Sequence, residues 1–528
     1  MNHIELFAGC GGLSLGLESA GFKLLIANEL SPMASETFAY NHQGVDLAAG
    51  QAPSRIYWVS SKYPRDNLRA RLRENPNDAV GLTGTHISDI QGNTHDSLDL
   101  MRSLLVGSIV DINSLLENHD WFHNLIRSGL GEGAVDLVSG GPPCQSFSLA
   151  GLRDHSHHRN QLPWEFARFI GYANPKIAIL ENVTGILRAF KLEGKSYYAW
   201  FEVAKAFAKV GYVPICLHIN AKYVGAAQNR PRFILLAFRE DVCKKLRNNS
   251  KDELLSKALA VSAEFYNLIK GGTNPEFGCL PYYDIEKDVS FYTDTIFSLL
   301  CTHRNSLVSV KDALDDLRSK SIPESEYVKK LNRLYHQECR HKKNKWANHE
   351  ERKNNNKVRA RFRLYQVMNR LPTSSAKEVT AYLKDVGTEG LSHSTLELLK
   401  RNWLLDMNGT KILRPTNTDM QILLSGVKTK KQTQKALVAE LPAPAALSIP
   451  DDACHYHESV EMQRTLTVRE MARIQSFPDW FEVRSKVTTG GQMRRFEVPQ
   501  YTQIGNAVPP ILGLALGNLC KELLKLSQ

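Results

Sequence analysis

The sequence predicts an α/β protein built on a parallel sheet that is covered by helices. Short apolar segments of strand length recur through the first 240 residues and are separated by helical or loop sequence. The first two, Ile4–Phe7 and Lys23–Asn28, flank a glycine-rich turn and a helical pattern, which is the β–turn–α–β order that opens a parallel sheet. Later apolar segments lie at Ala134–Ser139, Ile177–Leu180 and Phe233–Phe238.

The length of 528 residues favours two packed bodies over one. The α/β pattern covers residues 1–240, whereas from about Asp241 to Ala453 the periodicity is weaker, polar loops are more frequent and an Ala/Pro-rich stretch lies at Leu441–Pro450. We therefore predict a second domain after the α/β part. Residues 41–105 are basic around Arg65–Arg73 and give no further prediction.

Two helices are expected after this second domain. Leu466–Phe477 begins with Thr467 and has Glu470 three residues later, which is a capping-box arrangement. Ile511–Leu524 is apolar and follows a Pro-Pro pair.

The chain is basic, with 66 Lys and Arg against 55 Asp and Glu, a net charge of +11. Between Tyr327 and Arg370 there are fourteen Lys and Arg and three acids, a surplus equal to that of the whole chain. This predicts a polyanionic partner. Charge alone leaves a second interpretation open, because Val328, Leu331 and Leu334 have helical spacing and the charges between them could simply face water.

Several classes of protein are disfavoured. There is no run of about 18 uncharged apolar residues and no secretory signal after Met1, so we expect a cytoplasmic protein without a membrane partner. Nine cysteines without a CxxC pair fit a reducing compartment. The clusters at 336–341 and 454–457 each lack a second spaced pair of ligands, so no metal site is predicted.

The glycine-rich turn suits a nucleoside cofactor. Phe7, Gly9, Gly11 and Gly12 form the turn, and Glu29 ends the second predicted strand, where a carboxylate can accept hydrogen bonds from ribose hydroxyls. A nicotinamide or ATP site remains open on this feature alone, although GxGxxG and a Lys-Ser/Thr pair are both absent.

A cysteine stands at the end of another predicted strand. In Gly140–Ser148, two prolines precede Cys144 and fix the backbone at the edge of the sheet where α/β sites form. This position favours Cys144 as a nucleophile over the usual role of a free cysteine as a small buried side chain.

With these residues in place, the chain resembles the DNA (cytosine-5)-methyltransferase family, and its motifs fall in that family's order. The matching segments are Glu5–Gly12, Asn28–Leu30, Pro142–Gln145, Glu181–Val183, Gln228–Arg232, Arg464–Glu470 and Gln503–Pro510. Two positions depart from the family pattern: Glu5 stands where Asp is usual, and Ser108 stands where an Asp is expected to contact the adenine amine. Asp111 could compensate for the second.

The resemblance implies a Rossmann-like catalytic domain dependent on S-adenosylmethionine (SAM), in residues 1–240 and 455–528, with an inserted, partly helical target-recognition domain at 241–454. It implies that the Cys144 thiolate adds to C6 of cytosine, that Glu181 in a partly dry pocket protonates N3, and that Arg230 and Arg232 are fixed donors beside the base or the thiol. The cofactor contacts expected are Phe7, Ala8, Gly9, Gly11, Gly12, Glu29, Leu30, Ser108, Ile109, Pro143, Asn506, Ala507 and Val508.

The target cytosine must leave the duplex, and the loop at 148–160 is expected to close over it. The DNA contacts expected are Gln145, Ser148, Arg153, Arg159, Arg359, Arg361 and Arg363. The resemblance implies a monomer acting on a specific sequence in double-stranded DNA, for self-marking in restriction or phage defence alongside the other components of such a system. A tRNA cytosine-5 methyltransferase and a non-catalytic DNA-binding protein on the same fold are the alternatives.

Overall fold

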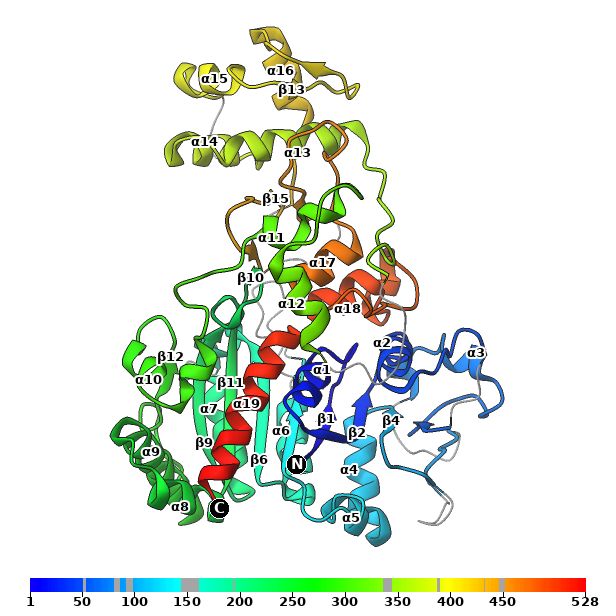
Figure 1. Ribbon diagram of the computed structural model, residues 1–528, viewed down its shortest axis with the longest axis vertical. Helices are drawn as coiled ribbons and strands as arrows, with labels where there is room; N and C mark the ends of the chain where they lie inside the picture. The colour runs from blue at the N-terminus through cyan, green and yellow to red at the C-terminus, as the bar shows by residue number, and fades with distance from the viewer. Residues whose placement is uncertain are drawn as a thin grey trace.

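The computed structural model describes residues 1–50, 54–79, 86–91, 98–143, 161–192, 195–335, 344–386, 390–431, 433–445 and 452–528. Its centre is a nine-stranded sheet in the order β12-β9-β11-β6-β5-β1-β2-β4-β3 (Figure 1). The strands are β1 (Asn2–Leu6), β2 (Lys23–Glu29), β3 (Ile56–Trp58), β4 (Ser103–Val106), β5 (Leu137–Gly140), β6 (Ile177–Val183), β9 (Tyr212–Asn220), β11 (Pro231–Arg239) and β12 (Tyr282–Asp284).

Strands β3, β4, β2, β1, β5 and β6 run parallel to their neighbours, and β11 is antiparallel to both β6 and β9. Because parallel strands all end at one edge, the ends of β1, β2, β4, β5 and β6 meet there, and the start of β11 joins them. The chain order reverses next to β1, where the neighbours are β2 and β5. Such a reversal leaves a crevice in which α/β proteins bind ligands. The predicted α/β class is confirmed.

Helices cover the sheet in layers. On the near face in Figure 1, α1 (Gly12–Ser19) packs along α19 (Pro510–Leu526), so the two ends of the chain lie side by side. A second layer contains α4 (Ile109–Asn118), α5 (Asp120–Arg127), α6 (Leu162–Ala173) and α7 (Ala199–Lys209), which contact one another in turn. The predicted helix 511–524 is confirmed as α19.

The sheet domain extends beyond residue 240. Helices α8 (Glu240–Asn249) and α9 (Glu253–Lys270) share its hydrophobic core, which continues to Cys301, and β12 is an edge strand of the sheet. The structure therefore differs from the expected boundary at 240, because the weak periodicity after that residue belongs to amphipathic elements that pack on the sheet.

The inserted domain is helical and stands at the top of Figure 1. Its separate core is built on α13 (Asn356–Met368), α14 (Thr373–Leu383), α15 (His393–Lys400) and α16 (Asn417–Gly426). A third core joins it to the sheet and contains α11 (Val310–Leu314), α12 (Glu326–Leu334), α17 (Val468–Ile474) and α18 (Gln500–Asn506). Helix α17 begins with the predicted capping box of Thr467 and Glu470.

Among the residues that the structure describes, no single helix is long and apolar enough to cross a bilayer. One pair of consecutive helices, Gly491–Asn506 and Pro510–Leu526, is together long and apolar enough, but the two helices are bent by 66° relative to each other. The apolar side chains of the second helix are largely buried in the core of the sheet domain.

Candidate active site at the carboxyl edge of the sheet

The turn after β1 has a backbone that few side chains tolerate. Phe7, Gly9 and Gly11 have φ values of 55°, 56° and 92°. A positive φ at a bulky residue such as Phe7 is rare and marks a constrained site. No atom lies within 4 Å of the position that a Cβ on Gly9 would occupy, so the backbone of this turn is open to a ligand.

Glu29 connects this turn to the end of β2. Its Oε2 accepts the Gly9 N–H at 2.8 Å, and its Oε1 accepts the Ser31 N–H at 2.7 Å. Burial raises the pKa of Glu29, and these backbone donors oppose the shift. A carboxylate offers about four acceptor positions, so Glu29 can hold the turn and still accept from a ribose hydroxyl.

The last predicted cofactor segment lies against the first. A Cβ on Gly12 would stand 2.3 Å from the carbonyl oxygen of Val508. Only glycine permits this approach, so Gly12 joins the start of α1 to the loop before α19. Next to Val508, Asn506 is exposed and Ala507 is partly exposed.

The other expected cofactor residues lie around the same edge, with different degrees of access. Leu30 is partly exposed and lines a shallow recess with Pro32, Val106 and Gly107. Ala8 and Ile109 are buried. Ser108 is buried and its Oγ accepts the Val110 N–H at 3.2 Å, which caps α4.

An adenosyl group fits these residues. The open backbone at Gly9, the carboxylate of Glu29 and the recess beside Leu30 match a nucleoside with a charged tail.

The acid motif adjoins the start of the cysteine loop. Asn182 Nδ2 donates to the carbonyl of Pro142 at 3.0 Å, and a Cβ on Gly141 would lie 3.0 Å from Glu181 Oε2. Pro143 is exposed at the edge. Cys144 lies outside the described residues, as do Gln145, Ser148, Arg153 and Arg159.

Glu181 forms an ion pair with Arg232, with 2.6 Å between Oε1 and Nε. Both residues are buried, each with 8% of its surface exposed. The pair results from strand register, because Arg232 lies opposite Val183 where β11 runs antiparallel to β6. This places a fixed cation beside the carboxylate at the entry to the cysteine loop.

Arg230 has a different environment. Its Nη2 donates to the carbonyl of Gly505 at 3.0 Å, which anchors the segment before Val508. Burial, followed by the charge of Arg232, lowers the pKa of this guanidinium. The structure thus separates two arginines that the motif alone could not distinguish.

The arginines expected to bind DNA from the inserted domain require a correction. Arg361 is buried and donates to the carbonyl of Val427 and to Gln434. Arg363 is 1% exposed, pairs with Glu458 at 2.9 Å and stacks on Trp403, with 3.9 Å to the ring centroid. Both guanidinium groups hold the domain together and do not face a phosphate.

Arg359 alone of the three is partly exposed, and it donates to the carbonyl of Val460 at 3.1 Å. The high density of charge in this segment did not show which of its arginines are buried. Charge alone does not indicate which side of helix α13 faces the core.

Sequence reasoning also missed residues of the 41–105 segment. Strand β3 pairs with β4 and extends the sheet, and Trp58, Ser60, Glu74 and Pro76 line the recess beside Leu30. No sequence motif marks these residues, and the only signal in this segment is its length between two strands.

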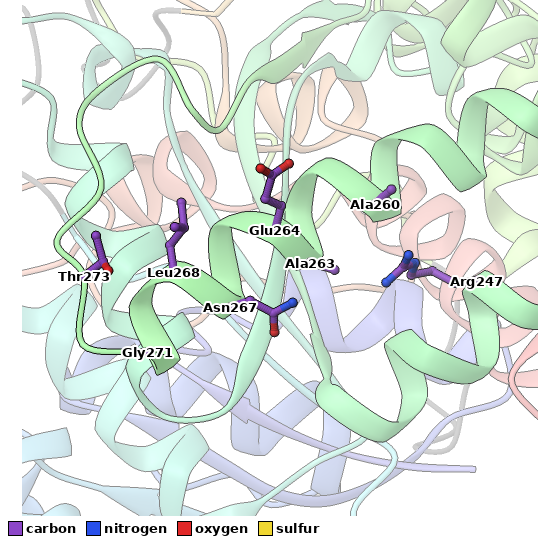
Figure 2. Close-up of a pocket in the computed structure, with 8 residues that line it drawn as sticks. All are labelled: Arg247, Ala260, Ala263, Glu264, Asn267, Leu268, Gly271 and Thr273. Atoms are coloured by element: carbon purple, nitrogen blue, oxygen red, sulfur yellow. The ribbon is translucent and has the colours of Figure 1, made fainter.

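A second recess lies between α8 and α9, away from this edge. Figure 2 shows that Glu264, Asn267 and Leu268 of α9 and Arg247 of α8 line it. Because α8 directly follows β11, which runs antiparallel to β6, the recess is at the opposite edge of the sheet. It shares no residue with the candidate site.

Comparison with known proteins agrees with this geometry. The sequence model of the C-5 cytosine-specific DNA methylase family matches residues 1–52 and 119–522. The type II methyltransferase M.DdeI of Desulfomicrobium norvegicum is 26% identical, over 98% of this chain and 87% of that protein. M.AgeI of Thalassovita gelatinovora is 24% identical over 99% of both chains, and M.PspPI of Psychrobacter sp. is 25% identical over 97% of this chain and 77% of its own.

The family match spans most of the chain and includes both cofactor segments, the cysteine loop, the acid motif and the arginine motif. The chain belongs to the C-5 cytosine-specific DNA methylase family.

Proposed function

We propose that this protein transfers a methyl group from SAM to C5 of a cytosine extruded from double-stranded DNA of a specific sequence, with Cys144 as the nucleophile. The observation that carries the proposal is the Glu181–Arg232 ion pair beside the loop that leads to Cys144. It adjoins an open, glycine-lined turn suited to a nucleoside cofactor.

The chemistry of cytosine requires these groups. C5 is a weak nucleophile, so the Cys144 thiolate adds to C6 and the ring takes up negative charge, which a proton delivered by Glu181 to N3 relieves. The adjacent C5 thereby becomes nucleophilic. SAM, when bound, supplies an electrophilic methyl group. Loss of the C5 proton, return of the N3 proton to Glu181 and expulsion of the Cys144 thiolate then restore the aromatic ring.

Arg232 orients this step. Its ion pair with Oε1 of Glu181 fixes the carboxyl group and leaves Oε2 on the side of Gly141, next to the cysteine loop. Arg230 acts through the backbone of Gly505 and is a positioning residue. The cations near the loop also favour the thiolate form of a cysteine.

The proposed cofactor contacts fall into two groups. The first group is at least partly exposed at the edge of the sheet and can touch the cofactor directly: Phe7, Gly9, Glu29, Leu30, Pro143, Asn506 and Ala507. The second group lies behind the first and shapes the turn: Ala8, Gly11, Gly12, Ser108, Ile109 and Val508.

The proposed partner is duplex DNA read by the inserted domain, and the proposed role is self-marking by a monomer in restriction or phage defence. Gln145, Ser148, Arg153 and Arg159 of the cysteine loop remain proposed DNA contacts, together with Arg359. The basic surplus of residues 327–370 supports a polyanionic partner.

Bisulfite sequencing of plasmid DNA from a host that expresses the protein tests this function. We expect methylated cytosines at one recurring sequence, and none with Cys144→Ala. Trapping on DNA that contains 5-fluorocytosine should give a covalent adduct with the wild type only. Methylation of tRNA in place of DNA in parallel assays would overturn the proposed substrate.

A further inference from the structure

Ser108, the residue expected to contact the adenine amine, already uses its hydroxyl within its own helix. Ser108 uses its Oγ to cap α4, and Asp111 is buried within that helix, with 2% of its surface exposed. Among the described residues, neither lines the recess beside Leu30. The acceptor that the family motif places here is therefore missing from the wall of the recess.

The outer wall of this recess comes from the segment that includes β3. This wall consists of Trp58, Ser60, Glu74 and Pro76, and the rest of the recess is lined by Leu30, Pro32, Val106 and Gly107. The two sides are in close contact. The Val59 N–H donates to the carbonyl oxygen of Val106 at 2.8 Å, and a Cβ on Gly107 would lie 2.7 Å from the Cβ of Val59. The family match omits residues 53–118, which include this wall.

Two polar atoms of the wall lack partners. Trp58 Nε1 and Ser60 Oγ are buried and form no hydrogen bond with any described residue. The two residues have 2% and 3% of their surface exposed. Buried polar atoms are nearly always paired, so an indole donor and a hydroxyl left unpaired beside a recess indicate a ligand with complementary groups.

The wall is rigidly built. Arg71 and Asp89 form a buried ion pair at 2.6 Å, and Asp89 Oδ2 also accepts the Trp58 N–H at 2.9 Å. Arg71 lies over the Trp58 ring, 5.2 Å from its centroid. Glu74 accepts from Ser61 Oγ at 2.8 Å and from the Lys62 N–H at 2.7 Å, which holds its carboxylate at the recess.

We propose that Trp58, Ser60 and Glu74 read the adenine edge of SAM in place of the missing acid. Ser60 and Glu74 supply acceptors for the exocyclic amine, and the Trp58 indole N–H supplies a donor for a ring nitrogen. This inference rests on the proposed use of SAM. It assigns a binding role to a segment that the family match omits.

Calorimetric titration of the purified protein with S-adenosylhomocysteine and S-inosylhomocysteine tests the proposal without relying on activity. The inosyl compound has a carbonyl in place of the amine, so the wild type should bind it at least about tenfold more weakly. We expect Ser60→Ala and Glu74→Gln each to weaken binding of the adenosyl compound about fivefold or more. Each should also reduce the ratio of the dissociation constants of the inosyl and adenosyl compounds. Trp58→Phe, which keeps the ring but removes the donor, should also weaken binding of the adenosyl compound.

Ser54→Ala is the matched control, because Ser54 belongs to the same segment but is exposed and does not line the recess. It should bind both ligands like the wild type. If Ser60→Ala and Glu74→Gln weaken both ligands equally, the wall is only structural and the inference is wrong. Unchanged affinities in all variants would overturn it too, while leaving SAM as the cofactor. A wild type that binds no S-adenosylhomocysteine would instead contradict the proposed function.

Discussion

The Nε atom of Arg232 lies 2.6 Å from Oε1 of Glu181, whereas Arg230, two residues earlier, donates to the carbonyl of Gly505. The two arginines of one motif therefore support different parts of the site. Arg232 fixes the acid beside the cysteine loop, and Arg230 ties the C-terminal segment to the sheet.

Replacing Arg232 with alanine should slow methyl transfer by about 100-fold, because the carboxyl group of Glu181 loses the cation that orients it. Single-turnover assays on saturating DNA measure this rate. Arg247→Ala, at the opposite edge of the sheet, is the control and should retain the wild-type rate. A rate for Arg232→Ala within about threefold of wild type would remove Arg232 from the proposed mechanism.

Glu181→Gln keeps the size of the side chain but removes the proton that it exchanges with N3. We expect the single-turnover rate to fall by about 10²–10⁴-fold with little change in DNA affinity. Filter binding and rate measurements on the same oligonucleotide separate the two effects. Loss of DNA affinity at an unchanged rate would mean that Glu181 serves binding and not proton transfer.

Gly12→Ala should destabilise the sheet domain by about 1–3 kcal/mol, because its Cβ would overlap the carbonyl oxygen of Val508. Affinity for S-adenosylhomocysteine should fall as well, since the two cofactor segments are forced apart. Urea unfolding and calorimetry measure the two effects. Gly272→Ala is a control for lost stability alone: the positive φ of Gly272 makes alanine strained there, but Gly272 lies after α9 with open space around it and far from the cofactor segments in sequence. If Gly12→Ala leaves ligand affinity unchanged, the join between the two segments does not shape the cofactor site.

Much of the sheet domain could be predicted from sequence, because buried parallel strands are short apolar segments and each site motif follows one of them. The segments ending at Leu6, Glu29, Gly140 and Val183 are strands β1, β2, β5 and β6. Because these strands run parallel, the motifs that follow them meet at the carboxyl edge of the sheet.

Other features depend on contacts that local patterns do not contain. Arg230 and Arg232 are two residues apart and share a face of an extended chain, so only the register with β6 and the approach of Gly505 distinguish them. Helices α8 and α9 look like the start of a new domain until their apolar faces are seen to pack on the sheet. The role of Trp58 and Ser60 arises from the pairing of β3 with β4, across more than forty residues of sequence.

Glu5 makes stability depend on pH. Burial raises its pKa to about 8 from the usual value of 4.5, and the Ser14 hydroxyl that donates to it opposes the shift. Between these pH values the folded chain holds a proton that the unfolded chain has released. The contribution of Glu5 to the free energy of unfolding is therefore fully present below about pH 4.5 and is lost as the pH rises to 8.

Glu5→Gln removes this loss. The free energy of unfolding of the variant relative to wild type should rise with pH by up to about 1.4 kcal/mol per unit between pH 4.5 and 8, and level off above that. Urea unfolding of both proteins from pH 5 to 9 measures the difference. Parallel curves across this range would show that Glu5 does not bind the proton.

Arg361 and Arg363 lie in the most basic part of the chain, yet their guanidinium groups are buried against Val427, Gln434, Trp403 and Glu458. We therefore expect Arg363→Met to destabilise the inserted domain by about 1–3 kcal/mol, because the Trp403 carbonyl and Gln366 lose their donor. A phosphate contact would behave differently: its loss lowers the slope of log affinity for DNA against log salt by about one. Below the unfolding transition, the slope for Arg363→Met should equal that of wild type. A lower slope at unchanged stability would return Arg363 to the DNA interface and require the inserted domain to open on binding.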